Sequence, residues 1–146
     1  MYSKNYIYAE DYFLWSQIAS KYSVANLFEV LILYREHSGS VSMQKENQQI
    51  ETTKKILAYH LAKLNIQPTK EELDLHYLLV WKPSGIDILN RKERKKISAW
   101  VEKLKLQNEK YQIYDREYFN RKLNSRWSWE KKFHIVFLHL KSYFKN

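Results

Sequence analysis

Glycine is scarcer in this chain than in most folded proteins, and that scarcity limits the folds available to it. Only Gly39 and Gly85 occur among 146 residues, which is about a fifth of the usual share. A doubly wound nucleotide-binding domain places glycines in the tight turns that hold phosphate groups, and this sequence has no glycine-rich phosphate loop. An autonomous nucleotide-binding domain is therefore not expected.

The length and composition indicate one folded domain. A chain of 146 residues is of ordinary domain size, and an aromatic content of 16% is too high for a disordered chain. The sequence has no cysteine, which excludes disulfides and thiolate metal sites. The N-terminus lacks the apolar core of a secretory signal, and the longest apolar runs are too short to span a bilayer. A cytoplasmic protein is expected.

Helical periodicity dominates the hydrophobic pattern. The run VLILY at 30–34 differs, because a continuous apolar run of this length is typical of a strand buried on both faces. The predicted elements are helices over 10–22, 43–64, 69–81, 91–111 and 115–144, and a strand over 24–26 and 29–35. The predicted fold class is mostly α, with one helix-strand element followed by a helical bundle. A short strand needs a sheet to join, so a partner for it is expected.

The stretch AEDYFLWSQIASKYSVANLFEVLILYREHSGSVS, residues 9–42, combines an acidic pair, a helix, a strand and an Arg-x-His that enters a Ser/Gly loop. In order and spacing it resembles the C-terminal signature of family 2 glycosyltransferases, which are inverting, sugar-nucleotide-dependent enzymes with the GT-A fold. The matching positions are Glu10, Asp11, Tyr12, Leu14, Trp15, Asn26, Leu27, Tyr34, Arg35, His37, Ser38, Gly39, Ser40 and Ser42. The resemblance implies that residues 1–42 end a GT-A catalytic domain, with the strand at the edge of its sheet. Residues 43–146 are then a helical C-terminal extension.

The resemblance also implies roles for these residues. Inverting transfer needs a base that takes the proton from the acceptor hydroxyl. The Asp of the family's Glu-Asp pair is that base, which is Asp11 here, with Glu10 in support. The family's Arg-x-His lies near the donor diphosphate, where arginine forms charge-assisted hydrogen bonds. Contacts with the donor phosphates are therefore implied for Arg35, His37, Ser38, Gly39, Ser40 and Ser42, and His37 is also a candidate metal contact.

The donor-binding half of such an enzyme has no counterpart in this sequence. That half carries an Asp-x-Asp site for a divalent metal, Mg or Mn, and the only aspartates here are Asp11, Asp74, Asp87 and Asp115. The chain is therefore expected to begin within the enzyme and to be inactive alone, with no tightly bound metal of its own. The nucleotide-sugar donor and the hydroxyl acceptor are partners of the parent enzyme.

Simpler interpretations remain open for each of these residues. Glu10 and Asp11 are also favourable charges at the N-terminus of a helix. Arg35 and His37, each taken alone, are ordinary surface residues. The remaining histidines have no metal-ligand spacing and are interpreted as structural or surface residues; they are His60, His76, His134 and His139.

Positive charge is concentrated in the second part of the chain. Residues 91–146 carry 16 Lys or Arg and 6 Asp or Glu, whereas residues 1–90 carry 9 and 10. The stretch 126–146 has aromatic residues and lysines in the pattern of a basic amphipathic helix. The alternative function is therefore a helical membrane-surface or protein-interaction module, peripheral at the inner face of the membrane. The charge run at 91–96 is interpreted as a solvated helix face, and no nucleic-acid partner is expected, because no nucleic-acid-binding motif accompanies it.

Overall fold

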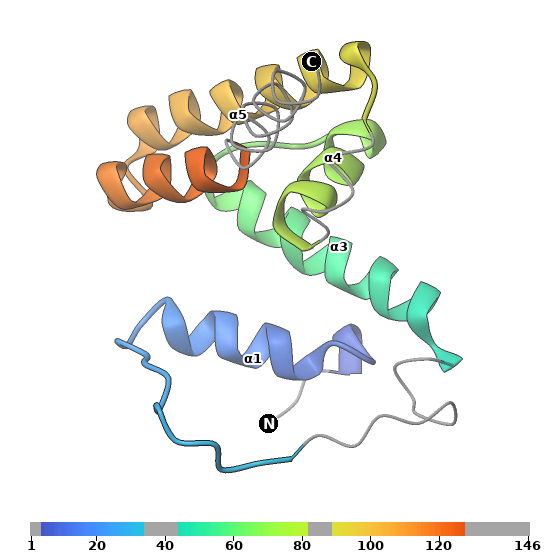
Figure 1. The fold of residues 1–146 in the computed structure, drawn as a ribbon, viewed down its shortest axis with the longest axis vertical. Coiled ribbons are helices and arrows are strands. Elements are labelled where there is room, and N and C mark those ends of the chain that lie inside the picture. Colours follow the sequence, from blue (N-terminus) through green and yellow to red (C-terminus); the bar gives the residue numbers. More distant parts are fainter. Residues whose placement is uncertain (1–3, 34–43, 82–88, 128–146) are drawn as a thin grey trace, which may run out of the picture. The chain divides into compact units, whose positions relative to one another are not determined.

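The computed structural model describes residues 4–33, 44–81 and 89–127, which are mostly α-helical (Figure 1). The elements in chain order are the short 3-10 helix η1 (Lys4–Tyr6), α1 (Glu10–Ala19), α3 (Glu46–Lys63), α4 (Lys70–Trp81) and α5 (Arg91–Tyr111), and residues 116–127 form a further helix. The predicted mostly α fold class is confirmed. The chain divides into two compact units, Met1–Ile56 and Leu57–Asn146, so α3 contributes residues to both. A domain boundary at 42/43 stays a prediction.

The predicted strand is not formed in the residues that the structure describes. Residues 23–33 are irregular, with a bend at 28–29. The physical reason is that a strand exists only when its backbone N–H and C=O groups pair with a neighbouring strand, and the described ranges contain no strand that could serve. The apolar sequence at 30–34 indicates that these residues favour burial, but it does not provide the neighbouring strand that a β-strand needs.

Side-chain caps set where α4 and α5 begin. Thr69 and Glu72 form a capping box: the Glu72 carboxylate accepts from the Thr69 backbone N–H at 2.9 Å, and the Thr69 hydroxyl accepts from the Glu72 N–H at 3.2 Å. Asn90 and Glu93 repeat the arrangement at the start of α5, with bonds of 2.9 and 3.0 Å. Each box satisfies backbone donors that the first helical turn leaves unpaired, and both lie where the sequence predicted helix starts.

The hydrophobic core of the second unit is built on one apolar stripe of α5. Ile97, Trp100, Val101 and Leu104 recur at helical spacing, and each is at most 2% exposed. Leu61, Leu64, Ile66, Leu79 and Leu123 complete this core, and Trp127 packs against it. Burial of large aliphatic and aromatic side chains is the main stabilising term here, at ~1.5–3 kcal/mol for each.

A buried asparagine fixes the turn that follows α5. The side chain of Asn108 accepts from the Tyr114 backbone N–H and donates to the Tyr114 carbonyl, both at 2.9 Å. Gln112 ends α5 in the left-handed region at φ 51°. Asp115 then caps the next helix by accepting from the Tyr118 N–H at 2.7 Å. These bonds give the 112–115 turn one defined conformation.

Residues 128–144 of the helix predicted over 115–144 lie outside the described residues. None of the helices in the described ranges has both the length and the apolar character that a membrane-spanning helix requires.

Candidate functional site

The acidic pair lies in the first turn of α1. Glu10 is the first residue of this helix and Asp11 the second. The Asp11 carboxylate is exposed, and its Oδ1 accepts from the Tyr12 backbone N–H at 2.7 Å. The helix macrodipole favours negative charge at this end, so the arrangement stabilises the helix and also presents a carboxylate to solvent. The simpler interpretation and the catalytic one are therefore compatible.

The backbone that leads into the acidic pair is constrained. Tyr8 has φ 72°, a left-handed conformation that is costly for a residue with a β-carbon. Ala9 follows with extended φ and donates its N–H to the Tyr6 carbonyl at 3.1 Å. The rings of Tyr6 and Phe13 stack with centroids 4.0 Å apart, which fastens η1 to α1. The chain thus reverses just before Glu10, and a non-glycine residue takes a strained conformation there.

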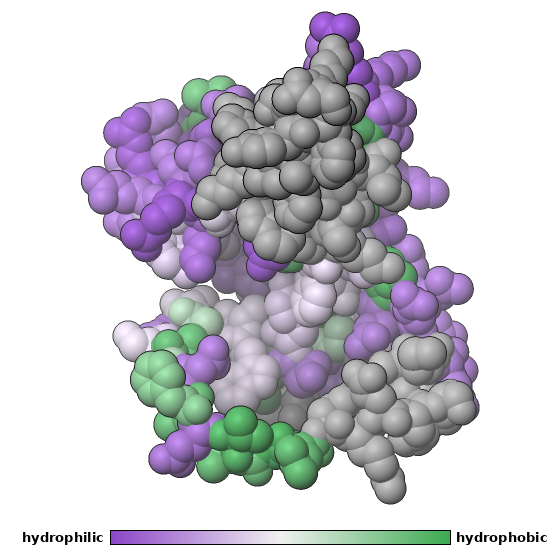
Figure 2. Space-filling model, viewed as in Figure 1, coloured by the Kyte–Doolittle hydropathy of each residue, from purple (hydrophilic) through white to green (hydrophobic). Residues whose placement is uncertain are grey.

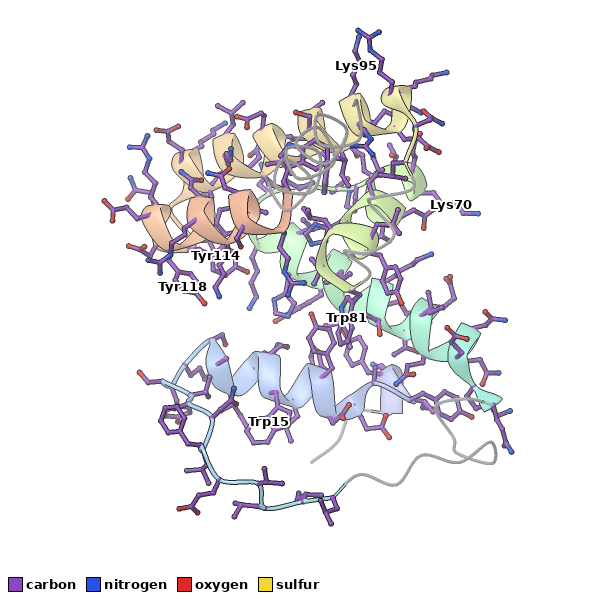
Figure 3. The ribbon with its side chains drawn as sticks, viewed as in Figure 1. Trp15, Lys70, Trp81, Lys95, Tyr114 and Tyr118 are labelled. Atoms are coloured by element: carbon purple, nitrogen blue, oxygen red, sulfur yellow. The ribbon has the colours of Figure 1, made fainter. Side chains whose placement is uncertain are left out.

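The segment 20–33, which follows α1, carries a continuous set of exposed apolar side chains. Val30 is 82% exposed and Leu33 is 91% exposed, and every residue from 20 to 33 is in the exposed class. Figure 2 shows the resulting hydrophobic patch along this part of the first unit. Trp15 projects from the neighbouring helix α1 and is also exposed (Figure 3). Monomeric proteins seldom expose apolar surface in such continuous form, so the segment is a candidate interaction surface.

The residues predicted to face the donor phosphates lie outside the described residues. Positions 34–43 include Arg35, His37, Ser38, Gly39, Ser40 and Ser42, and their roles stay predictions. The described residues contain no group of three or more His, Cys, Asp or Glu side chains that could hold a metal ion.

Two partly buried histidines lie in the second unit. His76 on α4 accepts a hydrogen bond at Nδ1 from the Trp100 indole. Burial, followed by the nearby charge of His60, lowers the pKa of His76 to about 4. Burial also lowers the pKa of His60, and the Lys63 ammonium adds to the effect. The neutral forms of both histidines therefore predominate at pH 7.

Sequence reasoning overlooked one residue that organises the second unit. Asn108 follows Leu104 by four positions and is 2% exposed, so it belongs to the buried stripe of α5. A polar residue at a core position is the signal that would have identified it, since a buried amide must find hydrogen-bond partners.

The described residues define a mostly α-helical protein that has an acidic helix terminus and an exposed apolar segment beside it. A Haemophilus influenzae protein named "Uncharacterized glycosyltransferase" is 39% identical to this chain over 70 residues, which is 45% of this chain and 22% of that protein. The chain therefore spans about a fifth of that relative's length. No protein-family model matches the chain, and no solved structure matches it. The similarity supports a glycosyltransferase-like origin.

Proposed function

We propose that this chain is the acceptor-side, C-terminal part of a family 2 glycosyltransferase with the GT-A fold. In this proposal it does not transfer sugar by itself. The rest of the enzyme supplies the nucleotide-sugar site, and this chain supplies the base and the helical extension. The reaction is the inverting transfer of a sugar from a nucleotide donor to a hydroxyl acceptor.

The observation that carries the proposal is the exposed apolar segment 24–33. Its residues have strand-forming composition, they follow directly on α1, and they are left uncovered. Such a segment gains stability by joining a sheet whose faces are covered by helices. The relative named as a glycosyltransferase is several times longer than the matched part, so a protein of that size has residues to provide such a sheet.

The chemistry assigned to this chain is the removal of one proton. Asp11 takes the proton of the acceptor hydroxyl while the hydroxyl oxygen bonds to the anomeric carbon. The bond between that carbon and the diphosphate breaks on the opposite face, and the nucleoside diphosphate leaves with the electron pair. The hydrogen bond from Tyr12 N–H to Oδ1 of Asp11 restricts how the carboxylate rotates, and the strained Tyr8 fixes where the helix begins.

In this proposal the donor is bound by residues 35–42 together with the rest of the enzyme. In the proposal Arg35, His37 and the serines contact the diphosphate. A divalent Mg or Mn ion would neutralise phosphate charge when bound. The described residues contain no group of His, Cys, Asp or Glu side chains that could hold such an ion.

A chimera tests the proposal. The part of the Haemophilus relative that precedes the matched region is joined to this chain, and release of nucleoside diphosphate is measured over a panel of UDP-, GDP- and dTDP-sugars. We expect turnover by the chimera and none by the 146-residue chain alone. Turnover by the isolated chain would overturn the proposal. So would a folded chimera that binds UDP but stays inactive with a donor that the intact relative uses.

The matched variants are Asp11→Asn and Glu10→Gln in the same chimera. Asp11→Asn is expected to reduce turnover by about 10²–10⁴-fold, the usual contribution of a general base, while the affinity for UDP stays unchanged. Glu10→Gln removes one charge at the neighbouring position and is expected to cost less. Full activity of Asp11→Asn would refute the assignment of the base.

The alternative function is a basic helical membrane-surface or protein-interaction module without catalytic activity, which would contact an anionic membrane through 126–146. The structure describes only the first two residues of that stretch. Its support is the basic and aromatic composition of the sequence.

A further inference from the structure

Five basic residues gather where α4 and α5 begin. Arg91, Lys92, Lys95 and Lys96 lie in the first two turns of α5, and all four are exposed. Lys70 is the first residue of α4 and is also exposed. An ion pair between Lys96 and Glu71 joins these two helix starts, so cations from two elements share one surface. Figure 3 shows Lys95 and Lys70 projecting outward from their helices. We call this set the basic patch.

The charges of the basic patch destabilise the start of α5. Arg91 and Lys95 are four residues apart, as are Lys92 and Lys96, so each pair places like charges side by side on the helix surface. The positive end of the helix macrodipole lies at the same place and disfavours cations there. An anion that neutralises the basic patch would remove both penalties.

The acidic groups beside the basic patch are already engaged. Glu71 pairs with Lys96, and the Glu93 carboxylate accepts from the Asn90 N–H in the capping box. Farther along, positive charge is balanced locally: Lys103 pairs with Glu72 at 2.6 Å, and Lys105 pairs with Glu102 at 2.7 Å. Within the basic patch, Lys96 is compensated by Glu71. The other described ion pairs that join or lie on these helices involve cations beyond the first two turns of α5, so the excess positive charge belongs to the rest of the basic patch.

The capping box also decides what kind of anion suits the basic patch. Asn90 Oδ1 accepts the backbone N–H groups of Lys92 and Glu93, at 2.9 and 3.0 Å. The helix therefore does not offer these donors as a cradle for a single phosphate. Attraction rests on long, separate Lys and Arg side chains, which suit an extended surface of many anions. The neighbouring aromatic residue of α5, Trp100, is 2% exposed and cannot serve as the stacking platform that single-stranded nucleic acid uses.

We propose that the basic patch is an electrostatic contact site for a membrane surface rich in anionic phospholipid. The inference is independent of the proposed glycosyl transfer. It differs from the membrane alternative based on 126–146, because it places the contact at the start of α4 and α5. Each Lys or Arg near an anionic bilayer strengthens the attraction, and salt screens it.

The experiment is cosedimentation of the full chain with vesicles. One set is phosphatidylcholine alone, and the other contains roughly a third phosphatidylglycerol, a fraction sufficient for a negative surface potential. We expect binding only to the anionic vesicles, and release when NaCl is raised from about 0.05 M to about 0.3 M. Absence of binding to anionic vesicles at low salt would overturn the proposal.

Two triple variants of equal charge change locate the contact. The test variant carries Arg91→Glu, Lys92→Glu and Lys95→Glu, and it should reduce the partition coefficient at least about tenfold. Because acidic residues favour a helix N-terminus, this variant should keep its helical circular dichroism. The control variant carries Arg121→Glu, Lys122→Glu and Arg126→Glu, which are also exposed positions, and it should retain most of the binding.

The outcomes separate the competing explanations. Equal losses in both variants would mean that net charge alone is responsible, and a loss confined to the control variant would move the contact toward 126–146; either result overturns the proposal. Tighter binding of the wild-type chain to a fluorescent RNA or DNA strand than to anionic vesicles would assign the basic patch to nucleic acid instead.

Discussion

The indole N–H of Trp100 donates a hydrogen bond to Nδ1 of His76 at 3.3 Å, and this bond joins α5 to α4 inside the second unit. The two rings meet edge to face with centroids 5.8 Å apart. Because Nδ1 accepts, the proton of the neutral imidazole lies on Nε2. The bond therefore requires neutral His76, which makes the packing of α4 on α5 sensitive to acid.

Acid should destabilise the second unit through His76. The pKa of His76 falls from 6.5 to about 4 on folding, so the unfolded chain takes up a proton first as the pH drops. Stability is complete above pH 6.5 and is lost progressively down to about pH 4. Linkage gives about 2 kcal/mol lost between roughly pH 7.5 and pH 5 from this residue. Urea unfolding at a series of pH values measures the loss.

Substitution of His76 isolates its part of the acid effect. His76→Asn keeps an acceptor near the Trp100 indole but does not titrate, so the slope of stability between pH 6.5 and pH 4 should fall. His60 contributes in the same direction, since its pKa is also lowered on folding, and His60→Asn is the matched comparison. An unchanged slope in His76→Asn would contradict the interpretation.

Truncation of a side chain on the buried face of α5 should destabilise the second unit, whereas truncation on its exposed face should not. Leu104 is 1% exposed, whereas Leu106 is 64% exposed on the same helix. Leu104→Ala leaves a cavity and should cost about 2–5 kcal/mol. Leu106→Ala should change stability by less than about 0.5 kcal/mol. Equilibrium denaturation compares the two, and similar losses would mean that the core is assigned to the wrong face.

Removal of the Asn108 side chain should weaken the turn after α5. Asn108→Ala leaves the Tyr114 backbone N–H and carbonyl without their partner, at an expected cost of about 1–3 kcal/mol. Asn124 lies at an exposed position of the following helix, and Asn124→Ala should have little effect. Hydrogen exchange at the Tyr114 amide provides a local readout. Continued protection of that amide in Asn108→Ala would argue against the role given to the side chain.

The exposed segment 24–33 should make the isolated chain prone to association. Val30 and Ile32 are each 82% exposed, and exposed apolar patches with strand-forming composition pair with one another. Val30→Ser with Ile32→Ser should reduce self-association by light scattering and reduce binding of a hydrophobic dye. The unfolding of the second unit should be unaffected. If the wild-type chain stays monomeric and binds no dye, the segment is covered in solution.

Local signals predicted most of the helices. The capping boxes of Thr69 with Glu72 and of Asn90 with Glu93 act within four residues, so the sequence alone places those helix starts. The buried face of α5 can also be inferred from the sequence, because Ile97, Trp100 and Leu104 recur at helical spacing. The acidic pair was also located correctly, since its position depends only on where α1 begins. Its catalytic role stays a prediction, as do the roles of residues 35–42.

The features that can be inferred from the sequence are therefore local ones: helix bounds, caps and the apolar face of α5. The tertiary structure decided which distant groups meet, such as His76 with Trp100 and Lys96 with Glu71, because such pairs depend on how helices cross. It also decided that 24–33 is irregular in the described residues. The pattern of that segment favours a strand, but a strand is completed by hydrogen bonds to another strand, and its own sequence cannot provide them.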